Sequence, residues 1–215
     1  MASGPSDENV EQTKRQIRDL VNQVTELSKS DVDASEFYPS VLQRVVSALA
    51  APGGAIWLLD GESGLRLAHQ IDIAPHLVDA RNEEAIQHGR LLGRLIQNGK
   101  AELVPPMSGS AETGEANPTK YLLVTSPLVS SKGPVGLLEV FQRGQTPPEA
   151  QRGYLRFVEH MAKLIGDWIK GHTLQEVSTR QELWQQSDQF ARSALLHSSS
   201  GLDTRRHRDA FVSDR

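Results

Sequence analysis

The sequence has no cysteine among its 215 residues. Disulfide bonds, thiolate metal sites and catalysis by a thiol are therefore excluded for this chain. Long apolar runs are also missing, since none approaches the roughly 18 residues that a membrane-spanning helix needs. The opening residues, MASGPSDENVEQTK, are polar and acidic, unlike a signal peptide. These absences lead us to expect a soluble cytoplasmic protein that does not bind a membrane.

A strong charge of either sign is absent as well, because the formal net charge is only -4 at pH 7. Nothing in that balance favours nucleic acid as a partner. The length suffices for one domain of about 150 residues with helical or disordered flanks, and a domain of that size buries an ordinary core without disulfides or metals.

What the chain does contain is the apolar stretch YLLVTSPLVSSKGPVGLLEVFQR, residues 121–143. Its two halves, 121–129 and 135–141, are rich in Leu, Val and Phe and flank a Ser-Ser-Lys-Gly-Pro connection. This pattern predicts a β-hairpin at the middle of an antiparallel sheet. The stretch carries no nucleophile, acid–base pair or set of metal ligands, so it indicates a class of module more readily than a ligand.

A second hairpin is predicted from AIWLLD (55–60) and LRLAHQI (65–71), which flank a Gly-Glu-Ser-Gly turn. Alternation places Leu65 and Leu67 on one face of the second strand, with His69 as a further candidate for that face. Helices are predicted over 10–29, from a cap at Asp33 or Ser35 to residue 51, over 82–97, and from Pro147 onward, with a short edge strand over 101–104.

The first predicted helix carries a narrow apolar stripe. Val10, Ile17 and Val24 recur at intervals of seven, with Leu20 and Leu27 between them. Two heptads are too short for a coiled coil that is stable alone. The stripe is explained equally well by a helix that lies on its own domain and by one that pairs with its copy in a dimer.

These elements divide the chain into a series of segments. We expect a disordered N-terminus (1–9), an N-terminal helix (10–29), one domain (30–172), a helical extension (173–197) and a tail (198–215) that is disordered or begins another domain. Within the domain, MSGSAETGEANPTK (107–120) is the longest turn-rich segment, and loops of this length are usually functional or mobile.

Three patches, in this order, resemble the GAF domain family. They are GGAIWLLDGESGLRLAHQ, with its apolar strand and Asp-Gly turn; TSPLVSSKGPVGLLEVF, with its Pro-Leu strand and its Gly-Val-Leu return strand; and the closing helix around FVEHMAKLIGDWI. The resemblance covers roughly residues 30–172. It implies an α+β fold: a single GAF-like domain with a central antiparallel β-sheet of five to six strands and the terminal helices packed on one face.

The resemblance also implies a ligand pocket on the other face of the sheet, roofed by residues 72–120, and a regulatory or sensory role in dimers joined through terminal helices. The weak candidates for ligand contacts are His69, His76 and Tyr121. No two of the histidines have metal-ligand spacing on one element, so we expect no metal site. A partly exposed histidine with local hydrogen bonds is the plainer interpretation of His69, His76 and also His88.

Several chemistries of GAF relatives do not fit these residues. Bilin attachment and the reduction of methionine sulfoxide each require a cysteine. The cyclic-nucleotide signature is not matched either, because Asn98-Gly99-Lys100 is not followed by the required Phe or Asp-Glu pair. We therefore predict a module that is not an enzyme and needs no cofactor.

Two hypotheses of function remain. One is a sensory module in which an unidentified small molecule shifts the terminal helices of a homodimer. The other is a structural dimerisation and interaction module with a vestigial pocket. The stretch ARSALLHSSSGLD (191–203) looks like the lead-in to another GAF unit; if it is one and not a disordered tail, the module is a piece of a longer tandem-GAF signalling or secretion-adaptor protein.

Overall fold

The structure, a computed structural model, describes residues 5–61, 64–131 and 133–173. The chain divides into two units, Met1–Lys170 and Gly171–Arg215, and the fold below is that of the first. The helical extension and the tail that we expect after residue 172 lie, beyond residue 173, outside the described residues.

The centre of the domain is a five-stranded antiparallel sheet with the strand order β2-β1-β7-β6-β3. Its strands are β1 (Gly53–Asp60), β2 (Gly64–Ile71), β3 (Glu102–Val104), β6 (Tyr121–Ser130) and β7 (Gly133–Arg143). The two predicted hairpins, β1–β2 and β6–β7, lie side by side because β1 pairs with β7. The predicted edge strand is β3, which pairs with β6.

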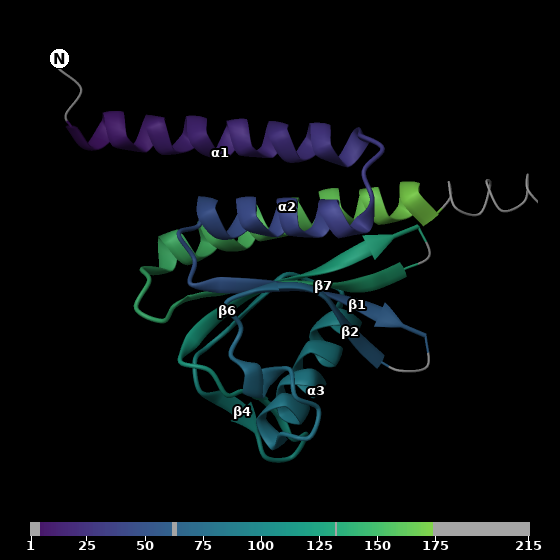
Figure 1. Ribbon diagram of the computed structural model, residues 1–215. Coiled ribbons are helices and arrows are strands. Elements are labelled where there is room, and N and C mark those ends of the chain that lie inside the picture. Colours follow the sequence, from purple (N-terminus) through teal and green to yellow (C-terminus); the bar gives the residue numbers. More distant parts are fainter. Residues whose placement is uncertain (1–4, 62–63, 132, 174–215) are drawn as a thin grey trace, which may run out of the picture. The chain divides into compact units, whose positions relative to one another are not determined.

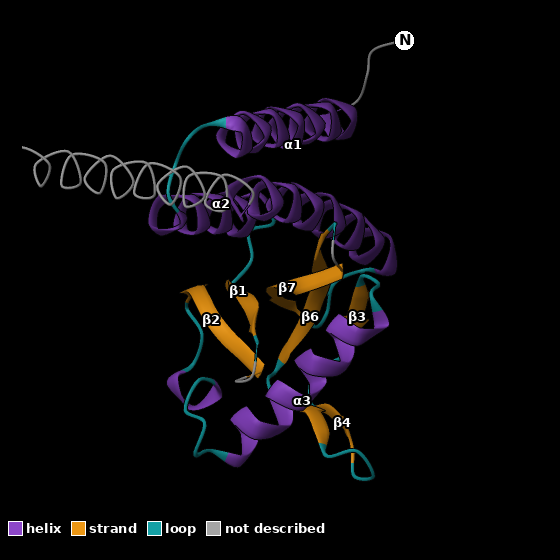
Figure 2. Ribbon diagram, turned by 90° about the vertical axis from the view of Figure 1, so that its right-hand side faces the viewer, coloured by secondary structure: helices purple, strands orange, loops and turns teal. Residues whose placement is uncertain are grey.

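Helices cover both faces of this sheet. They are α1 (Pro5–Lys29), α2 (Ala34–Ala48), α3 (Glu83–Asn98) and a C-terminal helix over residues 148–173, together with the short 3-10 helix η1 (Pro75–Leu77). Figures 1 and 2 show α2 and the C-terminal helix together on one face, with α1 outside them, and α3 on the other face. The predicted placement of the terminal helices on one face is confirmed.

The face under α2 and the C-terminal helix holds the larger core, which we call the helix-side core. Phe37 of α2 stacks on Trp168 of the C-terminal helix, with ring centroids 4.0 Å apart and an interplanar angle of 7°. The apolar face of α2 is buried here, as are the strand residues that point toward it: Ile56, Val124, Leu128, Leu138 and Val140. Tyr38 is also buried, and its desolvation raises the pKa of the phenol to about 12.

The opposite face carries a smaller core under α3, which we call the α3-side core. Its buried members from the sheet are Ala55, Trp57, Val104, Leu123, Leu137 and Phe141, and those from α3 are Leu91, Leu92, Leu95 and Ile96. Helix α3 begins where the Asn82 side chain accepts a hydrogen bond from the Glu84 N–H (2.9 Å), and it ends at Gly99, whose φ of 66° suits only glycine well.

Helix α1 begins at Pro5, so residues 5–9 are helical where we expect disorder. Proline suits the first turn of a helix, and acidic residues near a helix N-terminus are favoured by the helix dipole. On α1, Val24 is fully buried in the helix-side core, and Ile17, Leu20 and Leu27 pack against that core while partly buried. Val10 lies among the side chains that the structure does not describe.

The segment that we expected to be a functional or mobile loop contains a small hairpin of its own. Strands β4 (Ser108–Ser110) and β5 (Glu115–Asn117) pair in a two-stranded sheet. Few apolar residues are available to order these strands, so they depend on polar contacts with α3 and β3.

Gly166 sets how closely the C-terminal helix approaches the sheet. A Cβ atom at this position would lie 2.5 Å from the carbonyl oxygen of Val129 in β6, whereas one at Gly153 of the same helix would meet nothing within 4 Å. Overpacking of a core costs about 1–3 kcal/mol. Alanine in an open helix position gains up to about 1 kcal/mol over glycine.

We therefore expect Gly166→Ala to lower the free energy of unfolding in urea and Gly153→Ala to raise it. Equal effects of the two substitutions would show that the helix is not held against β6 at Gly166.

Candidate functional site

A pocket of about 630 Å³ opens on the α3 side of the sheet, where η1 and the end of the 107–120 segment meet β6 and β7. Small-molecule sites in proteins usually have volumes of about 300–1,000 Å³. The residues that line it include Asp72 and Lys120, the first and last residues of the segment that the resemblance assigns to the roof of a pocket.

The wall of this pocket is apolar in one part and polar in another. Ile73, Leu77 and Phe141 are buried and supply the apolar part. His76 and Lys120 supply basic groups, and the Lys120 ammonium lies 5.4 Å from the centroid of the Tyr121 ring. A few polar groups around an apolar surface are what a small organic ligand requires.

Two residues of the pocket have an unusual backbone. Asp72 and Met107 have φ values of 51° and 49°, in the left-handed region that non-glycine residues seldom adopt. Such residues concentrate at binding sites, where the surrounding structure holds them in place. Met107 is also 72% exposed, so an apolar side chain stands at the rim of the pocket.

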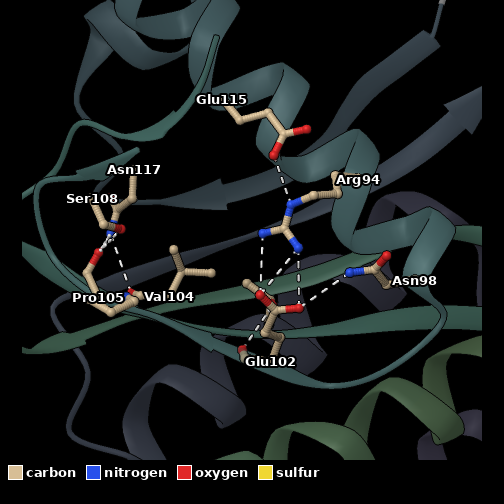
Figure 3. Close-up of polar contacts among 9 residues, drawn as sticks. Arg94, Asn98, Glu102, Val104, Pro105, Ser108, Glu115 and Asn117 are labelled. Carbon is tan, nitrogen blue, oxygen red and sulfur yellow. Dashed lines mark hydrogen bonds and ion pairs between the residues drawn. The ribbon is translucent and has the colours of Figure 1, made fainter. Parts of the chain in front are cut away.

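Asn117 holds the end of the 107–120 segment in position (Figure 3). Its side chain is 1% exposed, and its amide N–H groups donate to the carbonyl oxygens of Pro105 (2.8 Å) and Tyr121 (2.9 Å). Its carbonyl oxygen accepts from the backbone N–H of Thr119 at 3.0 Å. One buried amide therefore fixes the backbone on both sides of the small hairpin and sets the position of Tyr121.

Arg94 joins α3 to the short strands β3 and β5 (Figure 3). Its Nε donates to Glu115 of β5 at 2.8 Å, and its Nη2 donates to Glu102 of β3 at 3.2 Å. A planar guanidinium suits such contacts with two carboxylates at once. The ordering of β4 and β5 thus rests on charge-assisted hydrogen bonds from α3.

A buried charged cluster lies beneath α3. His88 of α3 is 1% exposed and its Nε2 lies 3.0 Å from Oε1 of Glu139, which is on β7 and is fully buried. The other carboxylate oxygen of Glu139 accepts a hydrogen bond from the indole N–H of Trp57 at 2.9 Å. Neither ring nitrogen of His88 makes a well-aligned hydrogen bond to a described residue. Burial alone would lower the pKa of His88, but the Glu139 carboxylate raises it above its ordinary value.

Sequence reasoning missed this cluster. His88 was expected to be partly exposed, which is wrong, and Glu139 was not singled out. The available signal was a single carboxylate inside the apolar run VGLLEVF, because a buried charge needs a partner. The partner could not be identified from the sequence, since the two residues lie on different elements.

The three candidate residues fall in different places. His76 and Tyr121 both line the pocket, although their contact with a ligand stays a prediction. His69 does not lie with Leu65 and Leu67, because a β-bulge shifts the register of β1 and β2 between Ile56 and Trp57. His69 is therefore opposite Ile56 of the helix-side core, on the other face from the pocket. Within the described ranges, no group of three acidic or histidine side chains could hold a metal ion.

The His88–Glu139 pair predicts a stability that depends on pH. The folded state keeps the His88 proton to a higher pH than the unfolded chain does. The contribution of His88 to the free energy of unfolding is therefore fully present below its unfolded-state pKa and is lost as pH rises through its folded-state pKa. In Glu139→Gln the amide oxygen can still accept the hydrogen bond from Trp57. Without the carboxylate, burial alone acts on His88 and lowers its pKa, so the contribution of His88 to the free energy of unfolding rises with pH.

Urea unfolding of both proteins between about pH 6 and 9 measures the two slopes. Loss of one partner from a buried ion pair also costs about 3–5 kcal/mol where the other stays charged. His76→Gln, which removes a half-exposed histidine, serves as the control for histidine titration in general. Parallel pH profiles for the native chain and Glu139→Gln would contradict the pairing.

No protein-family model matches the sequence, and no curated protein matches it either. Solved structures do match the fold. The nlh2 GAF domain of A. aeolicus in an inactive state aligns with a TM-score of 0.58 at 18% identity, over 74% of this chain and 99% of that one. The GAF domain of a phosphoenolpyruvate-protein phosphotransferase from Coxiella burnetii aligns at 0.52 and 15% identity, over 76% and 98%.

An enzyme is also among the similar structures. The free methionine-R-sulfoxide reductase of Neisseria meningitidis, in complex with its substrate, aligns at a TM-score of 0.51 and 14% identity, over 72% of this chain and 91% of that one. The shared architecture is a five-stranded antiparallel sheet between two helical layers, with the strand hairpins and terminal helices placed as the sequence predicted. The chain has a GAF-like α+β fold.

Proposed function

We propose that this chain is a non-catalytic sensory or regulatory module of the cytoplasm that binds a small organic molecule in the pocket under η1. The observation that carries the proposal is the pocket itself, with its buried apolar wall beside His76 and Lys120. Two residues with a left-handed backbone at its edge add support. The GAF-like fold supports a regulatory role in general.

A non-catalytic role is favoured over the chemistry of the reductase among the similar structures. That enzyme is a reductase of free methionine-R-sulfoxide, and at 14% identity its likeness to this chain extends to the fold alone. The present chain has no cysteine to act as a reducing nucleophile. In the described residues, none of the helices combines the length and the apolar composition that crossing a membrane requires.

Binding in the pocket is tested by a thermal-shift screen of metabolites with an apolar body and an anionic group. A ligand that binds only the folded state stabilises it by RT ln(1 + [L]/Kd), which is about 2.7 kcal/mol at a hundredfold excess over Kd. Ala74→Phe fills the pocket from its wall, and His76→Gln removes a basic group.

Each of these two variants should weaken or abolish the shift in melting temperature, whereas His69→Gln, a histidine off the pocket, should leave it unchanged. A hit that all three variants retain would mean that the ligand binds elsewhere, and a screen without hits would favour a vestigial pocket.

A second proposal is a homodimer formed through the terminal helices. It is supported by the apolar residues of α1 that its own chain buries only in part, among them Ile17 and Leu20. Val24 is no probe of this surface, because it is fully buried within its own chain and a polar substitution there would unfold the domain.

Sedimentation velocity of Ile17→Glu at micromolar concentration tests the dimer. We expect a shift from dimer to monomer, with Arg18→Glu, an exposed neighbour on the same turn, as the control. A native chain that is already monomeric, or an Ile17→Glu protein that stays dimeric, would refute pairing through this helix.

A further inference from the structure

A second hollow of about 440 Å³ lies on the opposite face of the sheet from the pocket, between the C-terminal helix and β6. We call it the Ser126 groove; its residues include Ser126, Pro127, Val129, Arg156, His160 and Lys163. Ser126 lies two residues from both Val124 and Leu128 in β6, so it is on the same face of the strand as they are. Both of those side chains point into the helix-side core. Its side chain therefore lies on the floor of the groove, beneath the helix.

The hydroxyl of Ser126 is the unusual group in this groove. Ser126 is 3% exposed, and its side-chain hydroxyl makes no hydrogen bond to any residue that the structure describes. Its neighbour Thr125, which is fully buried, donates to the carbonyl oxygen of Glu102 at 3.0 Å. The Ser126 hydroxyl oxygen is not among the fully buried polar atoms that lack a partner, so it is accessible from the groove that Ser126 lines. A ligand in the groove would supply the missing partner.

Basic side chains line the rim above Ser126. Arg156, His160 and Lys163 follow one another at helical spacing on one face of the C-terminal helix and are exposed. Among the described residues, no carboxylate lies within 4 Å of any of the three. Glu159 also lines the groove and carries one negative charge. The positive charges of Arg156 and Lys163 outweigh it, so the groove is positive even when His160 is neutral. This balance favours an anion, and a doubly charged one above a singly charged one.

The groove is not suited to an added β-strand. Strand β3 pairs with β6 only as far as Thr125, so the next residues of β6 form a free edge. Pro127 has no N–H to offer there, the pairing of β6 with β7 shifts register between Leu128 and Val129, and the close approach of Gly166 covers the Val129 backbone. Such features block the addition of a strand. A compact ligand fits better than an extended peptide.

We propose that the Ser126 groove binds a small molecule through a phosphate group. A phosphate monoester carries close to two negative charges at neutral pH and three acceptor oxygens. The Ser126 hydroxyl donates to one oxygen from the floor, while Arg156 and Lys163 bind the others from the rim. Pro127 and Val129, whose side chain is 49% exposed, provide apolar surface for the organic part.

NMR titration of the full chain with phenyl phosphate, inorganic phosphate and benzoate at constant ionic strength tests the proposal. We expect saturable shifts at the amides of Ala101 and Ser126, with phenyl phosphate binding more tightly than either of the other two. Arg156→Gln should weaken binding by about tenfold or more, since it removes a charge-assisted hydrogen bond. Arg152→Gln removes an exposed charge one turn away that does not line the groove, and should have little effect.

Ser126→Ala separates binding from a structural role. It removes an unpartnered hydroxyl, so the free energy of unfolding without ligand should stay unchanged or rise while phosphate binding weakens. A less stable protein with unchanged affinity would overturn the assignment. So would shifts that do not saturate, or equal weakening by Arg152→Gln and Arg156→Gln. The pocket under η1 lies on the other face, so neither result depends on the ligand proposed for it.

Discussion

The structure depends on the burial of β6 and β7 on both faces. Successive residues of these strands enter different cores: Val124 and Leu138 lie in the helix-side core, and Leu123 and Leu137 lie in the α3-side core. Both strands are therefore apolar almost throughout, as strands covered on both faces must be. The same alternation separates the pocket under η1 from the groove at the C-terminal helix, because each opens on one face of one hairpin.

Polar residues in such strands are costly, so each that remains needs a reason. Gln142 donates to the carbonyl oxygen of Leu49 at 2.7 Å and ties the end of α2 to β7, and Thr125 ties β6 to the edge strand. Glu139 accepts from Trp57 and lies against His88. Each of these three side chains thus joins elements that are distant in sequence. Ser126 differs from these three residues, because its hydroxyl is bound to no other described element and lines the groove.

The sequence predicts the elements whose information is local. Apolar runs in β1 and β7, the turn residues between strands and the helical spacing of Phe37, Val41 and Val45 were enough for both hairpins and for α2. It did not predict the bulge that moves His69 to the other face, because one extra residue in a strand leaves no distinct pattern. The small β4–β5 hairpin was missed for another reason: its order comes from hydrogen bonds of Arg94 to Glu115 and of Asn117 to Pro105, which join residues 21 and 12 positions apart.

The same distinction explains what was foreseen of the candidate site. The segment that the resemblance assigns to a roof, residues 72–120, contains His76 and is followed by Tyr121; both line the pocket, and their contact with a ligand stays a prediction. The His88–Glu139 pair and the Ser126 groove each combine a strand residue with a helix residue more than 25 positions away, so only the fold brings them together. Phe141 lines the pocket and belongs to β7, the strand to which the buried pair holds α3 and which the terminal helices cover on its other face. A ligand that displaces the Phe141 side chain would therefore act on β7 directly, and through β7 on the helix-side core.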